Sequence, residues 1–171
     1  IFMNAGAYGR EMREVVGEAH LYRPGKGFSV YRRDELEFSY RSSRLQTEEA
    51  ICVEVVFELA VGEESQIRQL MGELNGRRRD KQPLEYPSAG SVFKRPEGNF
   101  AGRLIEEAGL KGKQVGKAQV APKHAGFIVN LGGATAQDVL DLVALVRDEV
   151  YQKSGVWLEP EIRILGGSSP G

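Results

Sequence analysis

The hydrophobic periodicity of the chain changes near residue 60, and this change limits the folds open to it. Residues 51–59 read Ile-Cys-Val-Glu-Val-Val-Phe-Glu-Leu, which is rich in the β-branched and aromatic residues typical of strands. From Glu63 onward, apolar residues recur at helical spacing instead: Ile67, Leu70, Met71 and Leu74. The chain therefore passes from a sheet into a helix, and we expect a domain boundary near residues 60–66.

Further segments complete the expected order. Extended segments at 19–23 and 28–31 are separated by Gly25 and Gly27. Beyond this first helix, which has Arg77-Arg78-Arg79 at its end, the patterns predict a short helix, a strand, a longer helix and a last strand: 100–108, 125–131, from Thr135 to Gly155, and 157–165. Thr135 and Asp138 have the spacing of a capping box, and Gly109 and Gly155 are expected helix ends. Strands followed by mixed helices and strands predict an α+β fold.

Composition excludes several function classes. A net charge of −1 argues against a dedicated nucleic-acid binder. One cysteine, Cys52, and two histidines make a disulfide or a cysteine-rich metal site impossible within the chain, and we expect no metal. No apolar run approaches the roughly 20 residues of a membrane span. The first residues do not resemble a signal peptide, and we expect the chain to be a fragment.

Two segments in the first third combine small or aromatic residues with polar groups. Residues 4–9, Asn-Ala-Gly-Ala-Tyr-Gly, would let a ligand approach the backbone closely, although a simple turn is the more common meaning of such glycines. Arg41, in Tyr-Arg-Ser-Ser, could hold a carboxylate with two hydrogen bonds, but it could also be an ordinary surface arginine.

Two later segments carry possible proton-transfer groups. Ser91 follows an Ala-Gly pair, a placement that could present its hydroxyl in a cleft as a proton donor, or simply in a turn. In the expected strand at 157–165, period-two alternation would place Glu161 on one face with Trp157, Glu159 and Arg163. That charged face could line a cleft or meet water. The run Arg77-Arg78-Arg79 either complements a helix end or faces a diphosphate.

In this order and spacing, the segments resemble those of the MurB family, the UDP-N-acetylenolpyruvoylglucosamine reductases. The matching stretches lie at 4–9, 40–43, 82–96, 123–130 and 158–166. The most specific are Gln-Pro-Leu-Glu-Tyr-Pro-Ser-Ala-Gly-Ser-Val-Phe-Lys-Arg-Pro at 82–96 and Leu-Glu-Pro-Glu-Ile-Arg-Ile-Leu-Gly at 158–166. The Gln-Pro-Leu-Glu start is similar to the shorter branch of the family, which lacks an extra tyrosine-bearing loop.

The resemblance implies three parts. Residues 1–62 would be the C-terminal part of an FAD-binding lobe, whose N-terminal region with the pyrophosphate loop is missing here. Residues 63–156 would be a small α+β substrate-binding domain. Residues 157–171 would be a strand that returns a catalytic glutamate to the active site, followed by a flexible tail. The complete protein would be cytoplasmic, and this chain alone inactive.

The resemblance also implies a reaction and its residues. NADPH would reduce FAD, and UDP-N-acetylglucosamine enolpyruvate would be reduced to UDP-N-acetylmuramate for peptidoglycan. Catalysis would fall to Arg41 on the carboxylate, protonated Glu161 at the enolate-like intermediate and Ser91 as proton donor. Residues near the flavin would be Asn4, Ala5, Gly6, Ala7, Tyr8 and Gly9. Substrate contacts would come from Tyr40, Lys81, Arg95, Lys123 and His124.

Two other hypotheses stay open at this point. A non-redox module that binds a nucleotide sugar would need no flavin, and the missing N-terminal region favours it for this piece in isolation. A distant flavin oxidase on a similar fold would not need the Ser-Val-Phe-Lys-Arg-Pro stretch at 91–96, which argues against it.

Overall fold

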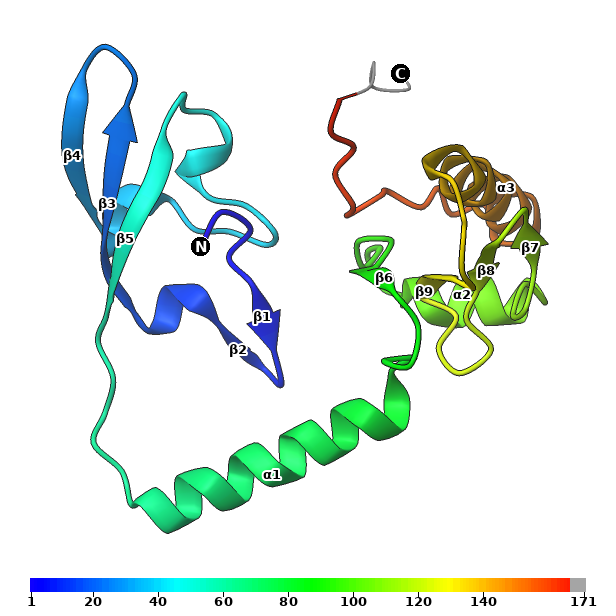
Figure 1. Ribbon diagram of the computed structural model, residues 1–171, viewed down its shortest axis with the longest axis horizontal. Coiled ribbons are helices and arrows are strands. Elements are labelled where there is room, and N and C mark those ends of the chain that lie inside the picture. The colour runs from blue at the N-terminus through cyan, green and yellow to red at the C-terminus, as the bar shows by residue number, and fades with distance from the viewer. Residues whose placement is uncertain (167–171) are drawn as a thin grey trace. The chain divides into compact units, whose positions relative to one another are not determined.

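The computed structural model describes residues 1–166 and divides the chain into two compact units (Figure 1). The first unit is Ile1–Glu64, and the second begins at Ser65. The sequence predicts the boundary between residues 62 and 63. It predicts a flexible tail at residues 166–171, of which 167–171 lie outside the described residues. The mixture of helices and antiparallel sheets confirms the α+β prediction.

An antiparallel sheet of three strands forms the first unit. β3 (Val16–Arg23) lies between β4 (Gly27–Arg32) and β5 (Ile51–Phe57). Gly25 turns β3 into β4 with φ of 75°, a left-handed conformation that favours glycine. One face of β3 buries Val16, Ala19 and Leu21 against Leu36 and Leu45. These two leucines come from the 3₁₀ turns η2 (Arg33–Leu36) and η3 (Arg44–Gln46).

The helix expected from Glu63 is α1 (Glu64–Lys81), and this prediction is confirmed. No residue of α1 is buried. Its apolar stripe stays in solvent, with Ile67, Leu70 and Met71 each about half exposed (47%, 54% and 57%). The positively charged arginines of its last turn interact favourably with the negative end of the helix dipole.

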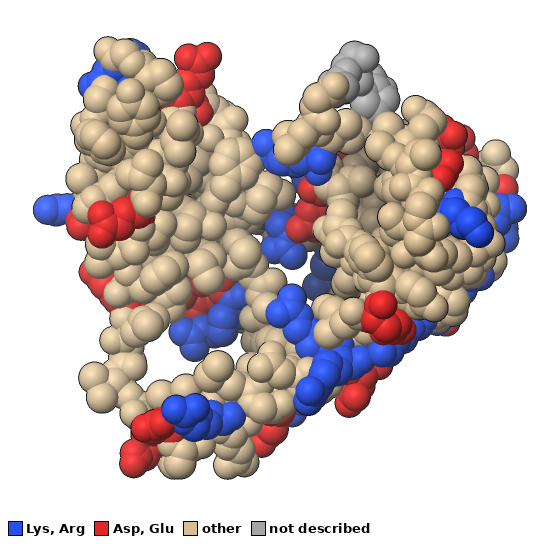
Figure 2. Space-filling view, viewed as in Figure 1, with Lys and Arg blue, Asp and Glu red and all other residues tan. Residues whose placement is uncertain are grey.

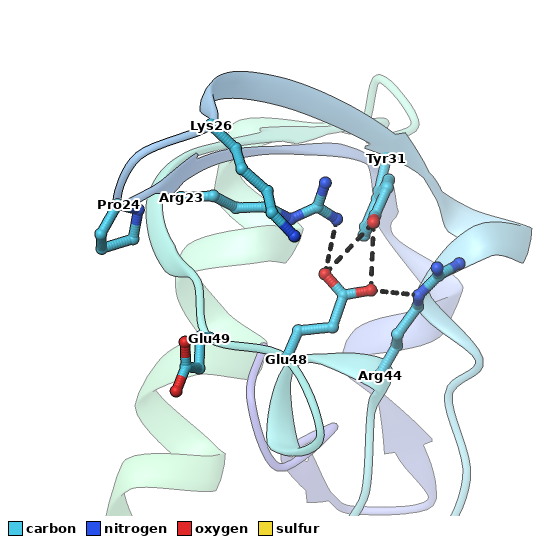
Figure 3. A pocket seen from close by; sticks show the side chains of 7 residues that line it. All are labelled: Arg23, Pro24, Lys26, Tyr31, Arg44, Glu48 and Glu49. Atoms are coloured by element: carbon cyan, nitrogen blue, oxygen red, sulfur yellow. Dashed lines mark hydrogen bonds and ion pairs between the residues drawn. The ribbon is translucent and has the colours of Figure 1, made fainter.

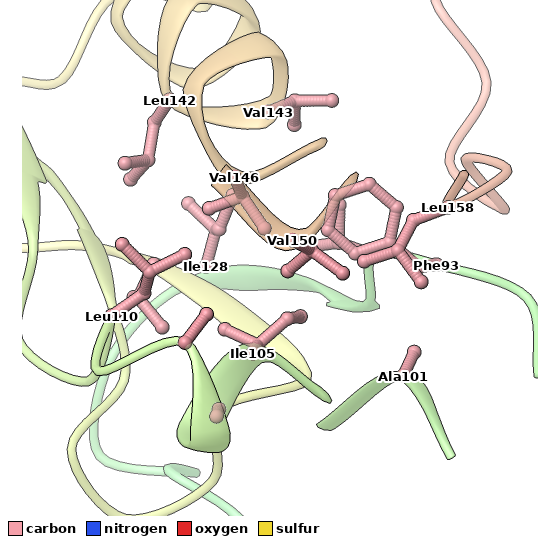
Figure 4. Close-up of a cluster of buried hydrophobic side chains, with 14 of the residues drawn as sticks. Phe93, Ala101, Ile105, Leu110, Ile128, Leu142, Val143, Val146, Val150 and Leu158 are labelled. Carbon is pink, nitrogen blue, oxygen red and sulfur yellow. The ribbon is translucent and has the colours of Figure 1, made fainter. Parts of the chain in front are cut away.

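The core of the second unit lies between a sheet and two helices. The sheet has the order β6 (Ser88–Ser91), β9 (Phe127–Asn130), β8 (Ala118–Val120), β7 (Gln114–Val115), and all neighbours are antiparallel. α2 (Ala101–Glu107) and α3 (Ala136–Ser154) supply the apolar residues that pack against it. Figure 4 shows Leu142, Val146 and Val150 of α3 facing this core.

Both helices begin and end where the sequence predicts. The Thr135 hydroxyl accepts from the Asp138 N–H at 3.1 Å, and the Asp138 carboxylate accepts from the Thr135 N–H at 3.0 Å. This reciprocal pair is the predicted capping box. Gly109 and Gly155 follow α2 and α3 with φ of 77° and 70°. Within the described residues, no helix is both long enough and apolar enough to cross a membrane.

The prediction of a strand at 157–165 is wrong. The segment makes one isolated bridge, between Pro160 and Phe93. Two backbone hydrogen bonds flank it, Lys94 N–H to Glu159 O at 2.8 Å and Glu161 N–H to Val92 O at 2.7 Å. Proline has no N–H to donate, so the ladder cannot continue through Pro160. In a regular strand Leu158 and Ile164 would lie on the same face. Leu158 is fully buried, but Ile164 is 39% exposed.

Candidate active site

The predicted site residues fall into both units, and each unit contains one cluster of them. The Arg41 cluster comprises residues 4–9, Tyr40 and Arg41 in the first unit. The Ser91 cluster comprises Ser91, His124, Gly126 and Glu161 in the second unit. Within residues 1–166, no group of three His, Cys, Asp or Glu side chains is placed to hold a metal ion.

Residues 4–9 form one arm and the tip of a tight hairpin. β1 (Gly6–Ala7) pairs with β2 (Arg10–Glu11), with Gly6 opposite Glu11 and Ala7 opposite Arg10. Tyr8 and Gly9 form the tip with φ of 53° and 79°, and type I′ turns require two such positive values. Ala5, Ala7, Tyr8 and Gly9 are exposed. The hairpin therefore presents small side chains and accessible backbone.

Asn4 has a different surrounding from its neighbours in this segment. It is fully buried, and its amide nitrogen donates to Glu11 Oε2 at 3.0 Å and to the Ser39 carbonyl at 3.1 Å. Its amide oxygen accepts from the Arg13 N–H at 3.0 Å. The polar groups of the Asn4 side chain are thus hydrogen-bonded to other groups of the protein. A flavin contact in this segment would therefore involve its exposed residues instead.

Arg41 lies at the apex of a turn beside this hairpin. Residues 39 and 42 exchange two backbone hydrogen bonds, of 3.1 and 3.2 Å, and Arg41 between them has φ of 53°. Its guanidinium lies 5.2 Å from the centre of the Tyr40 ring. A Cβ atom added to Gly6 would be 3.6 Å from an Arg41 guanidinium nitrogen. The structure therefore brings the Arg41 guanidinium close to Gly6 of the hairpin.

Backbone strain concentrates in the Arg41 cluster. Of the described non-glycine residues, four have positive φ: Asn4, Tyr8, Glu37 and Arg41. Three of the four belong to this cluster. Left-handed conformations cost non-glycine residues free energy and persist where surrounding contacts enforce them, often at functional sites.

A bulge in β6 presents Ser91. Ser88 is opposite Val129 and Ser91 is opposite Phe127, so β6 has one residue more than β9 between these pairs. Gly90 takes up the extra residue with φ of 86°. Bulges redirect side chains and are frequent beside active sites. Ser91 is exposed, while the next two residues, Val92 and Phe93, are buried.

Glu161 is connected by a backbone hydrogen bond to the residue that follows Ser91. Its N–H donates to the carbonyl of Val92, which immediately follows Ser91 in the chain. The buried side chain of Leu158 anchors the segment in the core (Figure 4). Glu159, the other carboxylate expected on this face, makes an ion pair with Lys94. Of the two, Glu159 is exposed and Glu161 half-buried.

His124 and Ser91 lie near the same glycine. The Gly126 N–H donates to His124 Nδ1 at 3.1 Å, and the imidazole packs edge-on against Phe127 with ring centres 4.9 Å apart. A Cβ atom on Gly126 would be 3.0 Å from His124 Cε1 and 3.7 Å from Ser91 Oγ. Burial lowers the pKa of His124 from its ordinary 6.5, which favours the neutral ring. With Nδ1 accepting, the proton of this ring is on Nε2.

The remaining predicted substrate residues make other contacts. Lys123 Nζ donates to the Arg79 carbonyl at 2.7 Å and lies 3.9 Å from Glu85. The Arg95 guanidinium carbon lies 3.9 Å from the centre of the Phe100 ring. Lys81 is exposed at the end of α1, where basic side chains gather (Figure 2). Beside them, Asn75, Arg78, Arg79 and Leu84 line a pocket of about 400 Å³.

Sequence reasoning missed one polar network, centred on Glu48 (Figure 3). Its carboxylate accepts from Arg23 at 2.6 Å, from Arg44 at 2.5 Å and from the Tyr31 hydroxyl at 3.0 Å. Burial raises the pKa of Glu48, but the two guanidinium groups outweigh it and hold the pKa below 4.5. The four residues are scattered along the chain, so no local pattern reveals them. They line a pocket of about 470 Å³.

Several features of the Arg41 cluster suit a flavin. Ala5, Ala7 and Gly9 of the hairpin are exposed and small, the exposed Tyr8 offers an aromatic ring, and Arg41 supplies a cation close to Gly6. These features fit an aromatic cofactor with its reactive edge near a guanidinium. They offer nothing specific to a pyrophosphate, which the resemblance assigns to another region.

Comparisons with known proteins agree with these motifs. A family model described as UDP-N-acetylenolpyruvoylglucosamine reductase, C-terminal domain, matches residues 82–165. Reductases of that name from Latilactobacillus sakei and Alkaliphilus oremlandii are each 52% identical, over 99% and 97% of this chain. The crystal structure of UDP-N-acetylenolpyruvylglucosamine reductase (MurB) from Thermus caldophilus has a TM-score of 0.83 and 40% identity over 95% of this chain.

The chain spans only part of the proteins it matches. It covers 56% and 55% of the two bacterial reductases and 57% of the Thermus caldophilus chain. The similarity extends through both units, since it covers nearly all of the chain. The chain therefore belongs to the MurB family of UDP-N-acetylenolpyruvoylglucosamine reductases.

Proposed function

We propose that the complete protein containing this chain is a cytoplasmic, FAD-dependent reductase driven by NADPH. Its substrate would be UDP-N-acetylglucosamine enolpyruvate, its product UDP-N-acetylmuramate, and its role peptidoglycan synthesis. The observation that supports the proposal is the Ser91 cluster: Ser91 follows a bulge, and the Glu161 N–H donates to the carbonyl of the next residue, Val92. Both residues lie in the stretch that the reductase family model matches.

The first proposed step is a hydride transfer that leaves negative charge on the substrate. Bound FAD, once reduced by NADPH, would supply a hydride to the methylene carbon of the enolpyruvyl group. Negative charge then develops on the adjacent carbon and its carboxylate. Arg41 would hold the carboxylate, because a guanidinium presents a fork of N–H donors that fits two carboxylate oxygens. Glu161, in its protonated form, would stabilise the enolate-like intermediate by hydrogen bonding.

Ser91 would complete the reaction by giving a proton to the carbanionic carbon. Serine is a weak acid, so the transfer requires a strongly basic acceptor held in contact with the hydroxyl. The bulge at Gly90 supports this role, because it turns an exposed hydroxyl out of a strand whose next residues are fixed in the core.

The other polar residues would bind the nucleotide sugar. His124, as a neutral ring with a proton on Nε2, is suited to donate to an uncharged sugar oxygen. Lys81 and Arg95 would contact the diphosphate, Lys123 the sugar side, and Tyr40 the region of the enolpyruvyl group next to Arg41. The fixed contact of Lys123 with the Arg79 carbonyl supports a site close to the end of α1.

Stopped-flow kinetics of Ser91→Ala in the complete protein tests the proposal. Flavin reduction by NADPH should keep its rate, while flavin reoxidation by the enolpyruvyl substrate should slow by about 10²–10⁴-fold, the usual contribution of a proton donor. Ser65→Ala, at an exposed serine in α1 outside the cluster, is the control. Equal slowing of both half-reactions in Ser91→Ala would contradict the assigned role.

A second candidate function is a non-redox module that binds a nucleotide sugar. It is favoured by one observation: the Ser91 cluster and most predicted substrate residues lie within a single compact unit. Adding FAD to the complete protein separates the two functions. Stoichiometric binding with quenched flavin fluorescence supports the reductase, whereas sugar-nucleotide binding without flavin binding supports the module.

A further inference from the structure

Arg41 is held in its strained turn by contacts on both sides of the apex. On one side, the Ser39 carbonyl accepts from the buried amide of Asn4 at 3.1 Å. On the other, the carbonyl of Arg41 itself accepts from Gln46 Nε2 at 2.9 Å. The first donor belongs to the hairpin segment and the second to η3. The backbone on each side of the guanidinium-bearing residue is therefore fixed.

Gln46 also contacts the segment that leads into the hairpin. The same amide nitrogen donates to the Phe2 carbonyl at 3.0 Å and lies 3.3 Å from Met3 Sδ. A glutamine amide has two N–H groups, and the two carbonyl oxygens of Phe2 and Arg41 can take one each. One side chain thus connects the Arg41 turn to the chain just before Asn4.

Neighbouring contacts keep Gln46 itself in place. Ser43, only 3% exposed, donates its hydroxyl to the same Phe2 carbonyl at 2.9 Å. Leu45 is buried in the first-unit core. The Glu48 network ties Arg44 of the same turn to Arg23 of the β3–β4 hairpin. Gln46 is therefore itself fixed, and its hydrogen bond adds to the two backbone hydrogen bonds that residues 39 and 42 exchange in the Arg41 turn.

From this geometry we propose that Gln46 is a positioning residue for the reaction. By holding the carbonyl of Arg41 it fixes the backbone of a left-handed residue, and with it the direction of the guanidinium relative to the flavin-side hairpin. The inference rests on the role proposed above for Arg41. Gln46 itself touches neither substrate nor cofactor in this account.

The test is Gln46→Met in the complete protein, which keeps the side-chain length and removes the donor. Reoxidation of the reduced flavin by the enolpyruvyl substrate should slow by about 10–100-fold, the usual consequence of a misplaced catalytic group. Reoxidation by ferricyanide, which needs no carboxylate grip, should not change. Thr47→Val is the matched control, because it removes a hydrogen bond to the Arg44 carbonyl in the same turn without touching Arg41.

A double-mutant cycle separates positioning from simple loosening of the fold. In an Arg41→Met background, Gln46→Met should add no further slowing, because Gln46 acts through Arg41. Additive losses, or equal slowing with ferricyanide, would overturn the inference. If Arg41→Met alone leaves substrate reoxidation unchanged, the proposed role of Arg41 fails. If Arg41→Met slows it and Gln46→Met does not, only the positioning role fails.

Discussion

At the scale of single residues, glycines shape both clusters. Gly6 lies close to the Arg41 guanidinium, Gly90 takes up the bulge before Ser91, and Gly126 lies against His124 and Ser91. The sequence shows Ser91 directly after an Ala-Gly pair and Arg41 between Tyr40 and two serines, and these patterns singled out both residues. It could not reveal the register of β6 against β9, because that register depends on pairing between residues far apart in the chain.

Gly126→Ala tests how tightly the Ser91 cluster is packed. A Cβ atom 3.0 Å from His124 Cε1 must displace the ring or the backbone, so we expect a loss of about 1–3 kcal/mol in the free energy of unfolding. Gly72→Ala in α1 is the control. Open space surrounds Gly72, and alanine favours helix there, so stability should rise slightly. Urea denaturation measures both, and unchanged stability of Gly126→Ala would show that the cluster is loosely packed.

His124 should make stability depend on pH. Burial lowers the pKa of His124 in the folded protein, so as the pH falls below about 6.5 the unfolded chain binds a proton that the folded protein resists. The free energy of unfolding should therefore decrease from pH 7 to pH 5. His124→Asn, which keeps an acceptor near the Gly126 N–H, should flatten this decrease. Parallel pH profiles of the two proteins, measured by chemical denaturation, would refute the assignment.

At the scale of elements, local patterns predicted the helices and the strand β9, and missed the short strands β1, β2, β6, β7 and β8. α1, α2 and α3 follow from apolar spacing and from caps that lie within a few residues of each other. β6 reads Ser-Ala-Gly-Ser, which has little strand propensity, and it is a strand because β9 supplies its partner. The segment 157–165 shows the reverse, since its alternation predicted a strand that Pro160 prevents.

Leu158→Ala tests what holds this segment in place. Leu158 is fully buried between the core residues near Phe93 and Val150, so truncation should cost about 3 kcal/mol. Because Leu158 anchors the chain three residues before Glu161, substrate reoxidation should fall as well. Leu165→Ala, at a position 91% exposed, should change neither. A Leu158→Ala protein with native stability, measured by thermal unfolding, would contradict this view of the anchor.

At the scale of the whole molecule, the residues proposed for one reaction come from two units with separate cores. Arg41 depends on packing in the first unit, and Ser91 and Glu161 on packing in the second. The family resemblance, which extends over the whole chain, connected these residues. Periodicity and spacing are local patterns, so they could not show that residues of different units act together.

The central claim is that Arg41, Ser91 and Glu161 act on one enolpyruvyl group. A crystal structure of the complete protein with FAD and UDP-N-acetylglucosamine enolpyruvate tests it most directly. The account predicts the Arg41 guanidinium on the substrate carboxylate, the Glu161 carboxyl within hydrogen-bond distance of the same carboxylate, and the Ser91 hydroxyl against the carbon that receives the proton. A bound substrate whose enolpyruvyl group touches none of these three side chains would contradict it.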